Sequence, residues 1–178
     1  MLPDRPVPVR AEEVLLRAYV PSDAADLLEA FADPLVRTWN PGPTDEAGVR
    51  EFMAARNDWS EGRHASWAIA DAGTGRLLGA VSLHQMDLEK GESELGYWVA
   101  PWARGRGVAS TAALRAARYG FDDLGLRRVF CFHAVENTGS CGVARRAGFL
   151  HEGTLRQSYK YADGRWHDEH LHARLAGD

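Results

Sequence analysis

The chain has 178 residues, a formal net charge of -4 and two cysteines, Cys131 and Cys141. A chain of this length can bury roughly two thirds of its unfolded surface without disulfides, so we expect one domain over residues 1–178. The acidic balance argues against a nucleic-acid partner, which needs a basic face, and two cysteines are too few for a disulfide framework.

The N-terminus MLPDRPVPVR lacks the apolar core of a signal peptide. No stretch of the chain approaches the roughly 20 apolar residues that cross a bilayer. We therefore expect a cytoplasmic protein with no membrane partner, in which both cysteines are reduced thiols.

The first half of the chain predicts a strand, two helices and an antiparallel meander. Ser22 is the expected N-cap of the first helix, and residues 36–44 are expected to be irregular because they contain two prolines and a glycine. The predicted strands cover residues 13–20, 65–71, 76–86 and 93–100, and the predicted helices cover residues 21–33 and 45–59.

The second half predicts a parallel crossover followed by a helix and a hairpin. The alanine- and leucine-rich segment 108–125 is typical of a helix, and 127–135 is typical of a strand, which a right-handed crossover places parallel to 93–100. A further helix over 137–148, capped by Asn137, precedes a C-terminal hairpin that turns at residues 162–164. The predicted fold class is α+β, a mixed sheet with flanking helices.

The segment RGRG, residues 104–107, joins the predicted strand 93–100 to the helix that begins at residue 108. The first turn of a helix has backbone N–H groups without internal partners, and glycines allow an anion to approach them closely. The Walker pattern is excluded because no Lys-Ser or Lys-Thr follows the glycines, and the dinucleotide fingerprint lacks its third glycine. A simple tight turn is the structural alternative.

The RGRGVA segment fits the Arg/Gln-x-x-Gly-x-Gly/Ala motif, and with ELGYWVAPW before it and NTGSCGVARRAGF after it the chain resembles the GNAT superfamily. The resemblance is to the subgroup that contains the ribosomal-protein N-terminal acetyltransferases, with Thr111 in a place where that subgroup usually has Glu. It implies a mostly antiparallel seven-stranded sheet, a central parallel pair splayed apart, and about four flanking helices.

The resemblance further implies that acetyl-CoA is the co-substrate, that the transfer needs no metal, and that a homodimer is an option. The pantetheine arm would bind β-strand-like backbone, and the diphosphate would bind the N–H groups of the loop. The expected cofactor-binding residues are Tyr97, Trp98, Val99, Arg104, Gly105, Arg106, Gly107, Val108, Ala109, Ser110 and Asn137.

The resemblance also implies that Ser140 is the acid that protonates the departing thiolate and that Glu94, rather than Glu92, is the general base. The structural alternatives are helix capping, with Asn137 as the N-cap and Ser140 in the first turn, and a solvated strand end for Glu94. Glu92 is a weaker candidate base, and His84 and His133 rank as secondary because a single histidine in a strand is more often structural.

Trp39, Asn40 and Tyr159 are expected to border the acceptor site, again by resemblance. Three histidines, His167, His170 and His172, raise the question of a metal. We expect none, because alternation along a strand places His167 on the opposite face from the other two.

These residues lead to the hypothesis of an N-acetyltransferase that acts on a primary amine, either a protein N-terminus or a small molecule. The alternative function is a non-catalytic acyl-CoA-binding or sensor module. Such a module would be free to lose Glu94 and Ser140, and this chain retains both.

Overall fold

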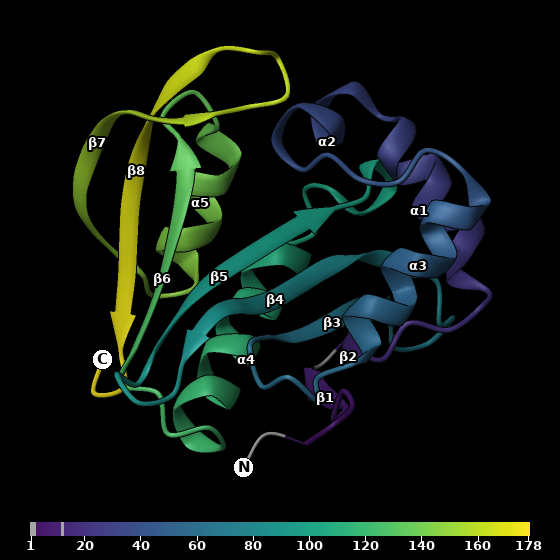
Figure 1. Ribbon diagram of the computed structural model, residues 1–178, viewed down its shortest axis with the longest axis horizontal. Helices are drawn as coiled ribbons and strands as arrows, with labels where there is room; N and C mark the ends of the chain where they lie inside the picture. Colours follow the sequence, from purple (N-terminus) through teal and green to yellow (C-terminus); the bar gives the residue numbers. More distant parts are fainter. Residues whose placement is uncertain (1–2, 12) are drawn as a thin grey trace.

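The computed structural model describes residues 3–11 and 13–178. They form one eight-stranded sheet in the order β1-β2-β3-β4-β5-β6-β8-β7, with helices on both faces (Figure 1). The strands are β1 (Val9–Ala11), β2 (Val14–Arg17), β3 (Ala65–Asp71), β4 (Leu77–Asp87), β5 (Glu92–Val99), β6 (Arg128–Ala134), β7 (Leu150–Lys160) and β8 (Trp166–Leu175). The helices are α1 (Asp23–Ala32), α2 (Pro34–Trp39), α3 (Glu46–Asn57), α4 (Val108–Asp122) and α5 (Thr138–Arg146), with a short 3-10 helix at Pro101–Ala103.

The sheet is antiparallel except for the pair β5 and β6, as the sequence predicts. Among the described residues, parallel pairing joins Glu92–Glu94 to Arg128–Phe130 and stops there. Beyond that point the two strands diverge, which Figure 1 shows as an opening between β5 and β6. The expected splayed parallel pair is therefore confirmed.

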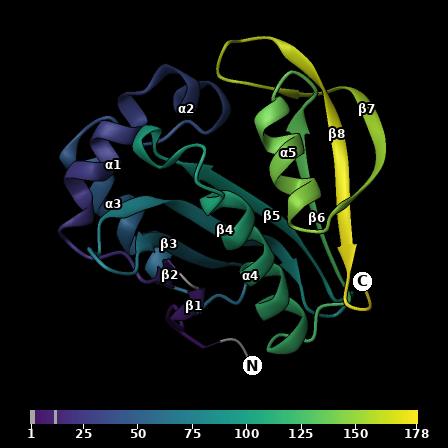
Figure 2. The same ribbon diagram turned by 180° about the vertical axis from the view of Figure 1, so that it is seen from behind.

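Two hydrophobic clusters fill the two faces of the sheet. Strand alternation sends Trp67 and Leu83 toward α4 and sends Ala68 and Trp98 toward α1. On α4 the residues that meet the sheet are small, and Ala112 is fully buried. Figure 2 shows α4 and α5 along the same face of the sheet.

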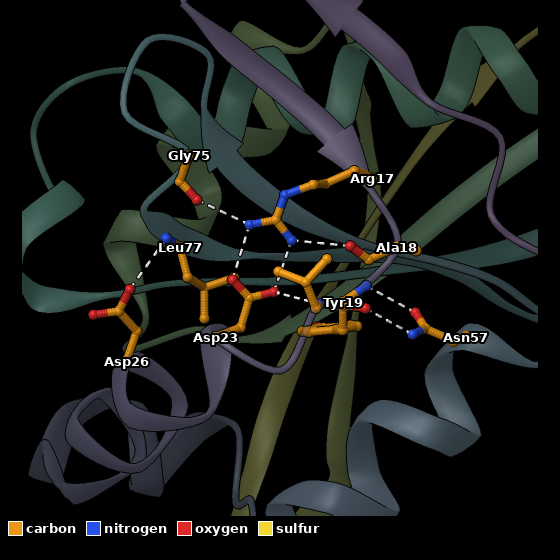
Figure 3. A network of polar contacts seen from close by, with 9 residues as sticks. Arg17, Ala18, Tyr19, Asp23, Asp26, Asn57, Gly75 and Leu77 are labelled. Carbon is orange, nitrogen blue, oxygen red and sulfur yellow. Dashed lines mark hydrogen bonds and ion pairs between the residues drawn. The ribbon is translucent and has the colours of Figure 1, made fainter.

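A buried ion pair attaches α1 to β2. Arg17 donates to both carboxylate oxygens of Asp23, at 2.7 and 2.8 Å, and Asp23 is only 2% exposed (Figure 3). Asn57, at the end of α3, exchanges two hydrogen bonds with the backbone of Tyr19. These contacts fix the position of α1 and therefore of α2, which follows it directly.

The structure differs from the sequence prediction at two elements and one helix cap. The sheet has eight strands because β1, which pairs with β2, was not predicted. Residues 36–39 belong to helix α2, because Pro34 occupies its first turn and Asp33 caps it by accepting from the Val36 N–H. Ser22 makes no side-chain cap bond; the Asp23 carboxylate instead accepts from the backbone N–H of Val20.

The remaining elements fall near their predicted positions, including the C-terminal hairpin of β7 and β8. None of the helices in the described part of the chain has both the length and the apolarity needed to cross a bilayer.

Candidate active site

A cavity of about 700 Å³ lies beside the end of β5, beyond the residues that pair with β6. The end of β5, the first turn of α4, helix α5 and helix α2 all contribute to it. Its lining residues are Leu35, Val36, Trp39, Asn40, Tyr97, Trp98, Val99, Ala103, Arg104, Gly105, Gly107, Val108, Ala109, Ser110, Asn137, Gly139, Ser140, Val143 and Arg146. Of the eleven predicted cofactor residues, only Arg106 is outside this lining.

The loop before α4 depends on its glycines for backbone conformation. Gly105 and Gly107 have φ values of 75° and 76°, in the left-handed region that other residues rarely adopt. Gly107 is the N-cap of α4 and has no side chain to occupy the N–H groups of the first turn. These amides therefore face the cavity without a protein cap, which suits an anion.

Two arginines of this loop are held by carboxylates on neighbouring elements. The Arg104 guanidinium lies 2.6 Å from Asp33, and this hydrogen bond lowers the pKa of the Asp33 carboxyl. The Arg106 guanidinium lies 3.4 Å from Asp71. Asp33 therefore fixes the orientation of the Arg104 side chain, which lines the cavity, whereas Arg106 points toward Asp71 at the end of β3.

The structure adds a basic residue that the sequence analysis did not single out. Arg146, in the last turn of α5, lines the cavity, and its Nε donates to the Ser110 hydroxyl at 3.2 Å. This contact places a guanidinium beside the first turn of α4. Arg145 and Arg146 are adjacent in the sequence, and only helix packing tells which of them faces the site.

A second cavity, of about 540 Å³, adjoins the first. Five residues line both cavities and so mark their junction: Trp39, Asn40, Tyr97, Asn137 and Ser140. Tyr159 lines the second cavity and also a third one of about 470 Å³, which Trp39 and Asn40 share. The structure thus brings together the three residues predicted to border the acceptor.

Glu94 lies in the second cavity and has an unusual environment for a carboxyl group. Its side chain is 19% exposed, and burial, followed by the charge of Glu169, raises its pKa to about 7. The Gln85 amide donates to Glu94 at 3.0 Å, from a β4 position where φ is 49° and the pairing with β5 is irregular. Glu94 is therefore a partly buried carboxyl whose raised pKa suits it to exchange a proton near neutral pH.

Glu169, on β8, is a second carboxylate in the same cavity and was not anticipated from the sequence. It is 7% exposed and accepts hydrogen bonds from the Ser158 and Tyr161 hydroxyls at 2.6 and 2.7 Å. The sequence DEHLH did not indicate that Glu169 enters the cavity, because the position of Glu169 depends on the pairing of β7 with β8.

Ser140 and Asn137 have structural roles that the sequence predicted. The Asn137 side chain caps α5 by accepting from the Ser140 N–H at 3.2 Å, and the Tyr97 hydroxyl donates to the Ser140 carbonyl at 3.1 Å. The capping uses the amide oxygen of Asn137 and leaves its NH₂ group available. Ser140 keeps its place at the junction of the two cavities.

The weaker candidates are less well placed. Glu92 lies 3.6 Å from Arg127 and lines none of the three cavities. His84 lines the second cavity, but burial lowers its pKa to about 4, so its imidazole is neutral at physiological pH. His133 lies outside all three cavities, and its Nδ1 contacts the Ala134 carbonyl at 2.9 Å.

Known proteins are similar to this chain in sequence and in fold. A family model described as "Acetyltransferase (GNAT) domain" matches residues 13–150. YdaF of Bacillus subtilis, provisionally named a ribosomal N-acetyltransferase, is 34% identical over 167 residues, covering 88% of each chain. A GNAT-family acetyltransferase of Bacillus anthracis superposes with a TM-score of 0.84 at 25% identity, over 97% of this chain and 100% of that chain.

Spermidine N-acetyltransferase of Vibrio cholerae, solved with CoA and spermine, superposes with a TM-score of 0.79 at 22% identity, over 94% of this chain and 98% of that chain. That last likeness concerns the fold alone. The family match and the YdaF identity go further: the chain belongs to the GNAT family of acetyltransferases, is an N-acetyltransferase, and is similar to members named for ribosomal substrates.

Proposed function

We propose that this enzyme binds acetyl-CoA in the 700 Å³ cavity and a primary amine in the adjoining 540 Å³ cavity. The single observation that carries the proposal is the junction, where Ser140 and Asn137 line both cavities. A thioester placed there would have its sulfur near the start of α5 and its carbonyl carbon open to the side on which Glu94 lies.

In the first cavity the diphosphate would accept hydrogen bonds from the first-turn amides of α4, with Arg104 and Arg146 supplying positive charge. The pantetheine arm would lie along the end of β5, whose backbone has no β6 partner beyond Glu94 among the described residues. Both contacts are general to acyl-CoA and do not select the acyl group.

In the proposed transfer, the bound ammonium first releases one proton to solvent, and the lone pair of the resulting neutral amine attacks the thioester carbon, so that a C–N bond forms and the C–S bond breaks. Glu94 takes the second proton from the nitrogen, and the CoA thiolate takes one proton from the Ser140 hydroxyl, which regains it from solvent. A pKa near 7 suits Glu94 for this role, because it can accept a proton at neutral pH and release it afterwards.

The acceptor is proposed to be cationic before it loses its proton. The charged groups in the described lining of the second cavity are Glu94 and Glu169, with no lysine or arginine among them. Similarity to YdaF favours the N-terminal amine of a ribosomal protein. A polyamine is the second candidate, favoured by the two carboxylates, which could bind two ammonium groups of one molecule.

The direct test is a thiol-release assay with acetyl-CoA against N-terminal peptides of ribosomal proteins and against spermidine, with mass spectrometry of the products. We expect one added acetyl group on a primary amine, and we expect Glu94→Gln and Ser140→Ala to reduce turnover while calorimetry shows retained CoA binding. Glu92→Gln is the matched control and should keep activity.

The alternative function, a non-catalytic sensor, predicts a different pattern. Acetyl-CoA would bind, but no tested amine would be acetylated and none would change the rate of thiol release. That pattern across both substrate classes would reject the proposed enzyme function.

A further inference from the structure

Four side chains that can ligate a metal meet between α5 and the sheet, outside the three cavities. They are His133 on β6, Cys141 on α5, and His170 and His172 on β8. Each offers one ligand atom, and these four atoms all lie within 4.8 Å of one another. The Cys141 Sγ lies 4.0 Å from the His172 Nε2.

The sheet register explains how residues distant in the sequence come together. His133 pairs directly with His170, and Cys131 pairs with His172, so both β8 histidines share a face with His133. Helix α5 follows β6 and covers this face, which brings Cys141 onto the histidines. His167 is not part of the group, because it contacts Asp163 at 2.9 Å and Glu136 at 3.2 Å.

The ring nitrogens in this cluster lack hydrogen bonds that buried nitrogens normally make. The buried nitrogens His133 Nε2, His170 Nδ1 and His172 Nδ1 have no partner among the described residues. His133 and His172 are 4% and 1% exposed, so water does not readily compensate for the missing bonds. Buried polar atoms without partners are rare in proteins and call for an explanation such as a bound ion.

The tautomer of His133 is fixed by its other nitrogen. Its Nδ1 lies 2.9 Å from the Ala134 carbonyl oxygen, which can only accept, so Nδ1 carries the proton. Nε2 therefore presents a lone pair toward the cluster. A ligand histidine whose second nitrogen donates to a backbone carbonyl is the usual arrangement in metal sites.

We propose that His133, Cys141, His170 and His172 form a zinc-binding site that joins α5 to strands β6 and β8. Imidazole nitrogens and thiolates are the ligands by which proteins bind Zn²⁺, and four of them would complete its tetrahedral coordination. Bonds of about 2.0 Å to nitrogen and 2.3 Å to sulfur place tetrahedral ligand atoms roughly 3.3 to 3.6 Å apart, so a pair separated by 4.8 Å must approach by roughly 1.2 to 1.5 Å. Small rotations of the four side chains can supply this movement.

The proposal replaces the expectation that the β8 histidines bind no metal. The site is distinct from the transfer chemistry, so the expectation of a metal-independent reaction is unchanged. Its consequence is mechanical, because Cys141 directly follows Ser140 in the first turn of α5. A bound ion would hold that turn against the sheet and so preserve the junction between the two cavities.

The first experiment titrates the purified, metal-free, reduced protein with Co²⁺, whose visible absorption reports coordination. We expect saturation at one equivalent, tetrahedral d–d bands and a thiolate-to-cobalt charge-transfer band, all displaced by Zn²⁺. Weak binding with only octahedral bands, or no charge-transfer band, would overturn the proposal.

Variants test which residues bind the ion. Cys141→Ser should remove the charge-transfer band. Cys141→Ser and His172→Gln should each lower the affinity for Zn²⁺ by more than about 100-fold, because even the loss of a residue that hydrogen-bonds to a ligand lowers metal affinity by about 10- to 100-fold. His167→Gln, on the same strand but outside the cluster, should bind Zn²⁺ as the wild type does. Equal affinity in Cys141→Ser and His167→Gln would contradict the assignment.

A measurement on the unmutated cluster covers the case in which a variant does not fold. Zn²⁺ should slow the alkylation of Cys141, followed by mass spectrometry of its peptide, and should raise the melting temperature. If saturating Zn²⁺ changes neither the alkylation rate nor the melting temperature, the site does not exist.

Discussion

Glu94 is the residue whose environment determines the expected pH dependence. Its pKa is about 7, and the base must be ionised to accept a proton, so the rate constant kcat/KM should rise as pH increases through 7. Glu94→Gln should lower the rate by about 10²- to 10⁴-fold and remove this rise. Initial rates from pH 5.5 to 9 test the prediction. If Glu94→Gln keeps the wild-type pH dependence of kcat/KM, another group is the general base, and Glu169→Gln is the next variant to measure.

The same pKa shift should reduce the stability of the folded state at higher pH. The carboxyl is protonated in both states below about 4.5, and only the unfolded state ionises between 4.5 and about 7, so the unfolding free energy falls across that interval. Glu94→Gln removes this loss, which is about 3 kcal/mol for a shift of this size without solvent screening; because the side chain is 19% exposed, we expect the variant to gain about 2 kcal/mol relative to wild type between pH 4.5 and pH 8. Urea unfolding at the two pH values measures the difference, and a pH-independent difference would contradict the buried environment.

Arg146 is predicted to contribute to cofactor affinity through its place beside Ser110. A charged hydrogen bond to a phosphate contributes about 1.5 to 3 kcal/mol, so Arg146→Ala should raise the KM for acetyl-CoA by roughly tenfold or more. Arg145→Ala removes the same charge from the same helix without touching the cavity and serves as the control. Equal KM values for the two variants would show that Arg146 has no specific contact with the cofactor.

At the scale of elements, the start of α4 forms part of the proposed diphosphate site. Gly107→Asp would place a carboxylate among the first-turn amides, and CoA binding by calorimetry should be lost. Gly164, in the β7–β8 turn, is the matched control, because its φ of 78° is nearly the same and it lies away from the cavities. Gly164→Asp should carry a similar strain and keep CoA affinity; loss of binding in both would point to unfolding instead.

The attachment of α1 to the sheet depends on Asp23. Replacing it with Ala leaves the Arg17 guanidinium, whose side chain is 15% exposed, without its bidentate partner. Breaking such a buried pair costs about 3–5 kcal/mol, so Asp23→Ala should lower the unfolding free energy by that order. Glu46→Ala breaks an exposed ion pair with Arg50 and should cost less than about 0.5 kcal/mol in the same denaturant titration. Equal costs would show that the Arg17 pair contributes no more than a surface pair.

Local sequence patterns predicted most elements but not the two that depend on flanking context. Helix α2 has six residues, and Pro34 and the Asp33 cap set its start. The prolines at 41 and 43 led the sequence analysis to predict an irregular segment there. Strand β1 has three residues and is stabilised only by pairing with β2. Short elements of this kind carry too few residues for a periodicity to show.

For the molecule as a whole, motifs on single segments predicted most residues that line the first cavity. Arg146 in the first cavity and Glu169 in the second were harder to predict, because they enter the site through helix packing and strand pairing. The same reason applies to His133, Cys141, His170 and His172, since spacing along β8 alone suggested a different set of histidines.

The central claim is that acetyl-CoA occupies the opening between β5 and β6 and presents its thioester at the junction of the two cavities. A crystal structure of the Glu94→Gln variant with acetyl-CoA tests it most directly. The account predicts the diphosphate at the first turn of α4, the sulfur beside Ser140, and the acetyl carbon open toward residue 94. A ligand bound elsewhere, or a thioester out of reach of both Ser140 and residue 94, would contradict it.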